Sequence, residues 1–344
     1  MEDRFDIVFV THLPVFYKIN LFNSINNYKK ILVIFVAQDT NIQRSDDFCS
    51  LDNAKFPFVV LSPDKLEKRN IFLNFKKLIS TLSKINFEHI VVSGWELLEF
   101  WLVILKGSKK KNAMILESTV HESKSTGIKG FIKRLFLSRI SKVFASGSLH
   151  SRLMGQLDFK GGIFITKGVG IIRRPPTILK KDCSIKNRVI YVGRLSEEKN
   201  LLRLIDVFIE VPDLYLDIYG SGPLEANLKK RAKSNVVFHG NIPNKNLGKA
   251  FEKADFLILP SEIEPWGLVV EEALYHGLEV LVSDRCGVIE ILDDLSIYSF
   301  DSDLKKVLLD YHARICLNSE TSNLKKSFLK EKDEIQIRAY TENL

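Results

Sequence analysis

Short aliphatic runs alternate with helix-length amphipathic segments along the first half of this 344-residue chain. The runs are rich in Val, Ile, Leu and Phe, as expected of strands that are buried on both faces. They lie at residues 5–11, 30–36, 58–61, 89–93, 113–116, 142–145 and 162–165. This order predicts a doubly wound, mostly parallel sheet with helices on both faces.

The same pattern starts again after a break at residues 173–187, which are rich in proline and charge and have no apolar period. Further strands are predicted at residues 188–192, 235–238, 254–259 and 279–283. The chain is long enough for two domains that each bury a core. We therefore predict an N-terminal domain (1–172), a linker (173–187), a C-terminal domain (188–322) and a terminal helix (323–344) that crosses back to the first domain.

The charge of the chain is unevenly distributed. Residues 1–180 contain 28 Lys and Arg against 15 Asp and Glu, a net charge of +13, whereas the whole chain carries +8. A basic N-terminal half favours an anionic partner, either nucleic acid or a lipid surface, and charge alone does not choose between them. The longest apolar run, residues 97–105, is interrupted by Glu99 and predicts a buried helix rather than a membrane span.

Cysteine spacing and the first residues indicate the compartment. Cys49, Cys183, Cys286 and Cys316 have no paired spacing, which argues against a zinc site or disulfide framework and favours a reducing cytoplasm. Charged residues occupy positions 2–6, so no signal peptide is expected at the start of the chain.

The stretch Pro260–Leu274 follows the predicted strand at 254–259. A helix is expected near Pro265, with Glu264 at the turn and Glu272 about two turns in. Carboxylates at the carboxyl end of a parallel strand accept hydrogen bonds from sugar hydroxyls, while the helix start attracts phosphate. The alternative is that Glu264 caps the helix and that Glu271 and Glu272 form an exposed acidic face.

Glu264 and Glu272, with seven residues between them, resemble the E-x7-E signature of family-4 retaining glycosyltransferases. Residues 191–200 (YVGRLSEEKN) resemble a second motif of this family, residues 218–224 (IYGSGPL) a third, and residues 238–240 (FHG) a fourth. The four follow the family's order over residues 188–292, while the first 170 residues resemble it only loosely. The resemblance implies a GT-B architecture of two Rossmann-like domains that face a cleft.

The resemblance also implies a reaction, in which a sugar moves from a nucleoside diphosphate to a hydroxyl with retention and without a metal or other cofactor. Arg194 and Lys199 would neutralise the leaving diphosphate, and the alternative is that they form surface salt bridges with Glu197 or Glu198. Glu264 would hold the hydroxyls of the sugar, and His121 would approach the sugar from the first domain. The donor-binding residues are expected to be Gly193, Gly220, Gly222, Pro223, Trp266, Gly267, Leu268, Glu272 and Gly287.

Acceptor contacts are expected from Tyr17 and Lys18, which resemble a P-x-x-Y-R turn of polysaccharide-building members with Lys in place of Arg. The alternative is that Lys18 is a solvent-exposed lysine at a helix start. The resemblance favours a UDP-sugar donor, a lipid-linked glycan acceptor and a role in surface polysaccharide synthesis, such as O-antigen, capsule or exopolysaccharide. It also favours a peripheral location on the inner face of the cell membrane, with no nucleic-acid partner.

Two segments leave alternatives open. The segment 124–142 has apolar residues at helical spacing beside a basic face, so it either packs on the core or lies in an anionic bilayer surface. Asp301-Ser302-Asp303 spells the D-x-D motif of metal-dependent glycosyltransferases, but its position before a helix favours a cap. No metal site is therefore expected.

Two rival functions remain. One is another GT-B enzyme, such as a nucleotide-sugar epimerase or a phosphorylase. Incubation of the protein with the donor alone, followed by a search for isomerised sugar, would distinguish this class. The other is a basic nucleic-acid-binding protein, which would leave the C-terminal motifs unexplained.

Overall fold

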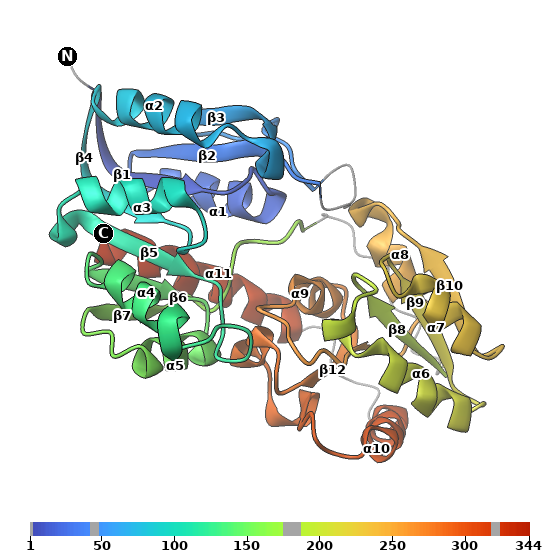
Figure 1. Cartoon of the computed structure of the whole chain (residues 1–344). Helices are drawn as coiled ribbons and strands as arrows, with labels where there is room; N and C mark the ends of the chain where they lie inside the picture. Colours follow the sequence, from blue (N-terminus) through green and yellow to red (C-terminus); the bar gives the residue numbers. More distant parts are fainter. Residues whose placement is uncertain (1–2, 42–47, 175–186, 318–323) are drawn as a thin grey trace. The chain divides into compact units, whose positions relative to one another are not determined.

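The computed structural model describes residues 3–41, 48–174, 187–317 and 324–344, which form two compact units (Figure 1). Unit 1 comprises Met1–Arg173 and Asp333–Leu344, and unit 2 comprises Arg174–Lys332. Most of the predicted linker at 173–187 lies outside the described residues, as do Cys183 and residue 323.

Unit 1 is built on a seven-stranded sheet in the order β3-β2-β1-β4-β5-β6-β7, with parallel pairing throughout. All seven predicted runs form strands. Strand order reverses between β1 and β4, where Ile7 pairs with His89. The strands are β1 (Asp3–Thr11), β2 (Ile31–Asp39), β3 (Phe58–Lys65), β4 (Ile85–Val92), β5 (Asn112–Leu116), β6 (Lys142–Ala145) and β7 (Gly162–Ile165).

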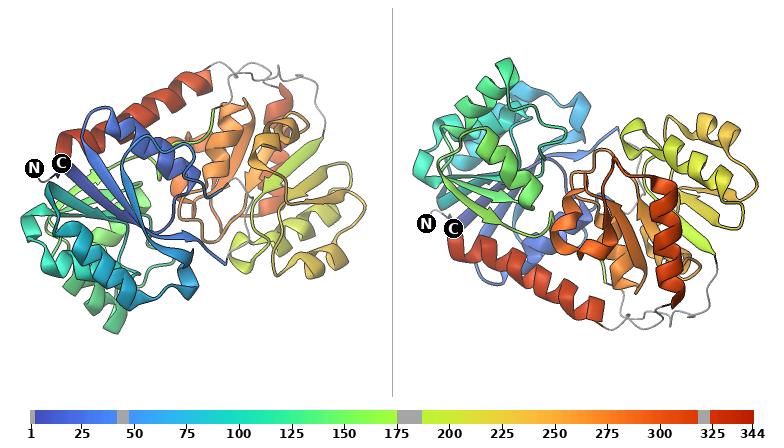
Figure 2. Two further views of the ribbon diagram at one scale, coloured as in Figure 1. Left: turned by 90° about the horizontal axis from the view of Figure 1, so that it is seen from above. Right: turned by 90° about the horizontal axis from the view of Figure 1, so that it is seen from below.

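Helices cover both faces of this sheet. Consecutive residues of a strand point to opposite faces, and in these strands the residues on both faces are apolar. Val8 and Val10 of β1 pack with α2, α3, α4 and α5, whereas Ile7 and Phe9 pack with α1 and the end of α11. Figure 2 shows this end of α11 on the sheet face opposite α2 to α4. The helices are α1 (Phe16–Asn26), α2 (Ile71–Leu82), α3 (Leu98–Lys106), α4 (Gly127–Leu137), α5 (Ser148–Gln156) and α11 (Leu324–Asn343).

Unit 2 holds a six-stranded parallel sheet in the order β10-β9-β8-β11-β12-β13. Its strand order reverses between β8 and β11. The strands are β8 (Arg188–Val192), β9 (Tyr215–Tyr219), β10 (Val236–Gly240), β11 (Phe256–Leu259), β12 (Glu279–Ser283) and β13 (Ile297–Tyr298). The two-residue β13 was not predicted, because so short a run carries no periodic signal.

Four α-helices connect strands in the described part of unit 2, and α10 (Leu304–Leu317) follows the last strand. The connecting helices are α6 (Leu201–Glu210), α7 (Glu225–Arg231), α8 (Leu247–Phe251) and α9 (Leu268–Tyr275). The expected start of α9 near Pro265 is wrong, since Gly267 has φ +105° and interrupts helical backbone there. Glu272 therefore lies just over one turn into the helix rather than two.

The expectation that residues 97–105 form a buried helix is only half right. Phe100, Val103 and Ile104 of α3 are buried, but Leu98 and Leu105 are 55% and 56% exposed. Glu99 is fully buried and accepts hydrogen bonds from the guanidinium of Arg69, which explains a charge inside this apolar run.

The predicted helix within 124–142 is α4, and most of its apolar residues face outward. Phe136 is buried against Trp101 of α3, with ring centroids 4.9 Å apart. Ile128, Phe131 and Leu135, by contrast, are 79%, 67% and 52% exposed. Only one side of α4 therefore packs on the core. Within the described ranges, no helix combines the length and apolarity that crossing a bilayer requires.

Tyr340 anchors the end of α11 in the core of unit 1. Its side chain is 1% exposed and stacks on Phe144, with ring centroids 4.6 Å apart, beside an edge contact to Phe9. Because truncating a buried aromatic residue removes contacts and leaves a cavity, we expect Tyr340→Ala to lower the stability of unit 1 by about 3–5 kcal/mol.

Urea unfolding measures this change, with Glu342→Ala, which removes an exposed side chain of the same helix, as the matched control. An unfolding midpoint for Tyr340→Ala equal to that of the control would contradict the role of Tyr340 as an anchor.

Candidate functional site

Three of the four predicted catalytic residues come together in unit 2, beside the carboxyl ends of β8 and β11. Gly193 and Arg194 directly follow β8, Lys199 ends the short helical turn after them, and Glu264 follows β11. The order of the strands reverses between β8 and β11. Open α/β sheets bind ligands at such a switch point, so the parallel topology itself defines the site.

Arg194 takes part in a small polar cluster. Its Nη2 donates to Glu198 Oε1 at 2.5 Å, and the hydroxyl of Ser196 donates to the same oxygen at 2.6 Å. Partial burial raises the pKa of the Glu198 carboxyl, but these hydrogen bonds outweigh it and lower the pKa to about 2. The Arg194 side chain remains 52% exposed, so part of its guanidinium is open to a ligand.

Lys199 and Glu264 form a direct ion pair that the sequence did not predict. Lys199 Nζ lies 2.7 Å from Glu264 Oε2, and the two side chains are 12% and 17% exposed. The pair joins the turn after β8 to the turn after β11. The main chain of Glu264 is held as well, because its carbonyl accepts from the N–H of Gly287 at 2.9 Å.

The glycines after β8 and β9 allow two backbone turns to touch. Gly220 has φ +133°, and a Cβ at this position would lie 1.9 Å from the carbonyl oxygen of Gly193. A Cβ on Gly222 would lie 2.4 Å from the carbonyl oxygen of Leu195. Any larger residue at these two positions would push the turns apart. Pro223 continues the same turn toward α7.

The turn between β11 and α9 is held by a buried tryptophan. Trp266 is 3% exposed and its indole Nε1 donates to Glu271 Oε1 at 2.7 Å. The Trp266 ring and the Glu271 carboxylate are therefore part of the core, and the alternative of an exposed acidic face is wrong for Glu271. Leu268 begins α9, where free N–H groups attract an anion. Glu272 accepts from Asn244 Nδ2 at 3.2 Å.

His121, Tyr17 and Lys18 belong to unit 1. The expectation that Lys18 is solvent-exposed is wrong: it is 5% exposed and its Nζ lies 2.8 Å from Glu117 Oε1. Burial lowers the pKa of Lys18, but the Glu117 carboxylate outweighs this and raises it above the ordinary value. The charge of Lys18 is therefore already balanced. Tyr17 is half-buried beside it, and its carbonyl accepts from the N–H of Ile171.

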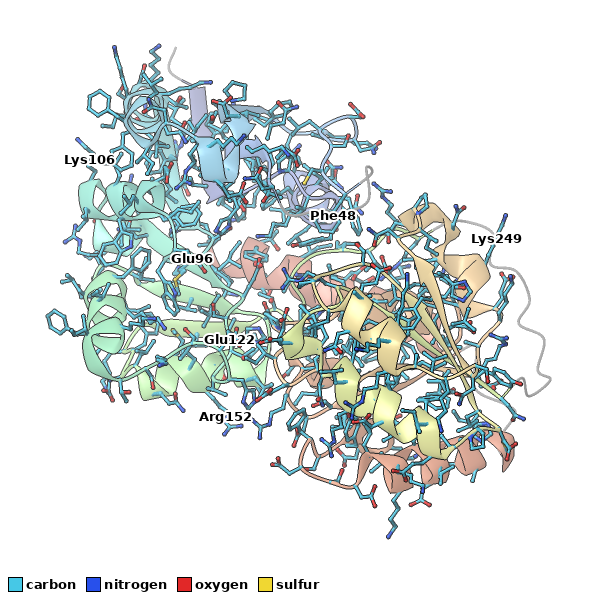
Figure 3. All side chains as sticks on the ribbon, turned by 45° about the vertical axis from the view of Figure 1, so that its right-hand side comes forward. Phe48, Glu96, Lys106, Glu122, Arg152 and Lys249 are labelled. Atoms are coloured by element: carbon cyan, nitrogen blue, oxygen red, sulfur yellow. The ribbon has the colours of Figure 1, made fainter. Side chains whose placement is uncertain are left out.

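The loop after β5 shapes the surroundings of His121. Glu122 Oε1 accepts from the N–H of Thr119 at 2.6 Å, and the N–H of His121 donates to the Thr119 hydroxyl at 3.2 Å. His121 itself is half-buried. Figure 3 labels Glu122 and also Glu96, which lies in the loop after β4, 3.7 Å from His12 Nε2. Acidic side chains thus line two adjacent loops at the carboxyl end of this sheet.

Sequence reasoning offers Glu198 as a partner of Arg194, and the structure has this pair. It misses Glu264 as the partner of Lys199 and Glu117 as the partner of Lys18. Both lie just after predicted strands, which was the available signal, but a partner from another loop is not visible in sequence.

The D-x-D segment behaves as a helix cap. Asp303 Oδ1 accepts from the N–H groups of Lys305 and Lys306, at the start of α10. Within the ranges that the structure describes, no cluster of three or more His, Cys, Asp or Glu side chains could hold a metal ion.

The stability that the Glu198 cluster contributes should decrease at acidic pH. Because the pKa of Glu198 is lowered from 4.5 to about 2, its contribution to stability is complete above pH 4.5 and is lost as the pH falls toward 2. We expect Glu198→Gln to be less stable than the wild type at pH 7, with the difference shrinking below pH 4.5.

Unfolding curves from pH 7 to pH 3 measure this difference, with Glu262→Gln at an exposed neighbouring position as the control. A difference between wild type and Glu198→Gln that stays constant over this range would contradict the assigned cluster.

Comparison with known proteins finds similarity over the part of the chain that holds these features. Residues 181–324 match the family model described as glycosyl transferases group 1. The sulfoquinovosyl transferase SQD2 of Arabidopsis thaliana is 34% identical over 110 residues, which are 32% of this chain and 22% of that protein. The matching stretches span 22 to 31% of the length of the first three curated relatives.

Solved structures resemble the whole chain at low identity. The lipopolysaccharide outer core galactosyltransferase WaaB has a TM-score of 0.70 at 14% identity, with 98% of this chain and 100% of that chain covered. Anabaena Alr3699/HepE in complex with UDP and glucose has a TM-score of 0.68 at 13% identity, with coverages of 99% and 100%. The fold is therefore that of the GT-B glycosyltransferases, and residues 181–324 carry the sequence pattern of glycosyl transferases group 1.

Proposed function

We propose that the chain is a retaining glycosyltransferase that moves a sugar from a nucleoside diphosphate to a hydroxyl, without a metal ion. The observation that carries the proposal is the arrangement at the switch point of unit 2. There an exposed guanidinium, a lysine–glutamate pair and two glycine turns lie within the segment that matches group 1 glycosyl transferases.

Stabilisation of the leaving diphosphate accounts for the basic groups. Cleavage of the glycosyl-phosphate bond leaves negative charge on the diphosphate, which Arg194 is suited to bind because its guanidinium offers paired donors. The free N–H groups at the start of α9 add a second anion site. Lys199 adds a positive charge, and these groups together take the place of a metal ion.

Glu264 is suited to bind the hydroxyls of the transferred sugar. The ammonium of Lys199 compensates the charge of the Glu264 carboxylate, which makes this carboxylate a weaker nucleophile. The carboxylate can still accept hydrogen bonds. Its weak nucleophilicity supports front-face attack by the acceptor hydroxyl rather than a covalent intermediate. Glu272, further along α9, would hold the ribose hydroxyls, and His121 of unit 1 would contact the transferred sugar once the domains close over the donor.

A UDP-sugar is the favoured donor, with support from the UDP and glucose complex of the similarly folded HepE. The acceptor is proposed to be a lipid-linked glycan of a surface polysaccharide, with support from the name of WaaB. Because Lys18 is paired with Glu117, we assign acceptor contact to hydroxyl groups near Tyr17 rather than to a phosphate on Lys18.

Donor binding tests the proposal. We expect UDP or a UDP-sugar to raise the melting temperature of the wild type, since a ligand at 100 times its dissociation constant adds about 2.7 kcal/mol. Arg194→Ala should abolish this shift. Arg231→Ala, at a surface pair with Asp206, should keep it.

Thermal-shift titration with UDP, GDP and their sugars measures donor binding. The absence of a shift with every nucleotide would contradict the donor site. Incubation with the bound sugar donor alone then separates transfer from epimerisation, because an epimerase would isomerise the sugar without an acceptor.

We also propose that unit 1 rests on an anionic lipid surface through its amphiphilic face, the outer side of α2, α3 and α4. Exposed apolar and basic side chains are interspersed on these helices, as in proteins that lie in a bilayer interface. The face comprises Phe72, Leu73, Lys76, Leu98, Leu105, Lys106, Ile128, Lys129, Phe131, Ile132 and Leu135. Figure 3 labels Lys106 at the end of α3. The net charge of +13 over residues 1–180 complements anionic headgroups.

Vesicle cosedimentation tests this surface. We expect binding to vesicles that contain phosphatidylglycerol, weaker binding to pure phosphatidylcholine, and a loss of binding at high salt because exposed charges are screened. The double variant Ile128→Gln/Phe131→Gln should bind several times more weakly. Tyr28→Gln removes a 71% exposed aromatic residue outside the face and should bind normally. Equal binding of all variants would contradict the proposal.

A further inference from the structure

A lysine and a glutamate are completely buried against each other in unit 2. Lys332 of α11 and Glu271 of α9 both have side chains with no exposed surface, and Lys332 Nζ lies 2.6 Å from Glu271 Oε2. The other carboxylate oxygen of Glu271 accepts from the indole of Trp266 at 2.7 Å. One carboxylate thus connects α11 to the turn that precedes α9.

Stability alone does not explain charges at this place. Removing two charges from water is costly, and an apolar pair of similar volume often stabilises a protein as well or better. A carboxylate differs from an apolar side chain in that it holds two donors in defined directions. The feature that Glu271 adds is therefore geometric: it orients the ammonium of Lys332 and the indole of Trp266 with respect to each other.

A further hydrogen bond connects Trp266 with the candidate donor site. The carbonyl of Trp266 accepts from the N–H of Val288 at 2.9 Å, next to Gly287. The next residue, Gly267, has φ +105° and lies directly before the first residue of α9. Glu272 follows Glu271 directly on that helix, so a rotation of α9 that moved one carboxylate would move the other.

A second contact ties the same elements together. Arg174 Nη2 donates to the carbonyl of Leu329 in α11 at 2.9 Å, and its guanidinium lies 5.8 Å from the centroid of the Tyr275 ring in α9. The chain enters unit 2 at Arg174 and leaves it at Lys332. Both ends of the unit 2 segment are therefore fastened to the helix that carries Glu272.

We propose that Lys332 is a positioning residue of the donor site. Through Glu271 it fixes the Trp266-Gly267 turn and the orientation of Glu272, although Lys332 itself does not touch the donor. Affinity for the nucleotide then depends on α11, the helix whose last residues pack in unit 1. This inference rests on the proposed function, because it assigns a support to the same donor site.

Two double variants separate positioning from stability. Lys332→Met/Glu271→Leu and Lys332→Met/Glu271→Gln both remove the buried charges, but only glutamine keeps an acceptor for the Trp266 indole. Lys332→Met alone leaves the Glu271 carboxylate buried without its cation. Lys330→Met, at an exposed lysine of the same helix, is the matched control.

The measurements are the dissociation constant of the nucleotide that binds the wild type, by calorimetry, and the unfolding midpoint of each variant. We expect both double variants to be more stable than Lys332→Met. We expect the glutamine variant to bind the nucleotide several times more weakly than the wild type, because it lacks Lys332. The leucine variant should bind about tenfold more weakly still, because a small misplacement of a binding group is costly. The control should match the wild type in both measurements.

Equal affinities of the leucine and glutamine variants, with both close to the wild type, would overturn the positioning role. Affinities that simply follow the unfolding midpoints would overturn it as well, since they indicate a purely structural pair. If the wild type binds no nucleotide, the proposed function fails, and the positioning role fails with it. Failure of the inference alone is recognised by normal nucleotide binding in the wild type and in both double variants.

Discussion

Parallel pairing is the constraint on which the rest of this structure depends. Because the described strand pairs of both sheets are parallel, the loops that follow the strands of a sheet gather at one edge. In unit 2, the turns after β8 and β11 meet where strand order reverses, and the Lys199–Glu264 pair joins them. The glycine contact between Gly220 and Gly193 brings in the turn after β9. The candidate site is therefore built from several loops that meet at this edge of the sheet, and no single loop supplies it.

Three basic residues that were expected to bind ligands are each paired with a glutamate in the structure. Arg194 faces Glu198, Lys199 faces Glu264, and Lys18 faces Glu117. Under the proposed function, a diphosphate would compete with Glu198 for an arginine that is already oriented, so little side-chain ordering remains to be done on binding. Lys18, in contrast, is itself buried, while its partner Glu117 is partly exposed.

Much of the fold was predictable from sequence. Continuous aliphatic runs such as residues 30–36 predicted strands correctly, because burial on both faces requires such runs. The boundaries of elements were less reliable: Pro265 suggested a helix start, whereas the positive φ of Gly267 decided that α9 begins at Leu268. The apolar residues of α4 also fitted a core helix equally well, since periodicity shows that one side is apolar but not which surface it meets.

The sequence by itself determined the two α/β units, because runs of apolar residues are a short-range property. Motifs that resemble a known family singled out Arg194, Lys199 and Glu264 as candidates, and the structure places all three beside the ends of β8 and β11. Only the tertiary structure decided that Lys199 pairs with Glu264, 65 positions away. The pairing of Lys332 with Glu271 joins residues 61 positions apart. The pairing of Lys18 with Glu117 depends on the sheet order β1-β4-β5, which brings the loop after β5 close to the segment after β1. The physical reason is that an ion pair depends on distance and burial in space, and both are set by how the strands and helices pack.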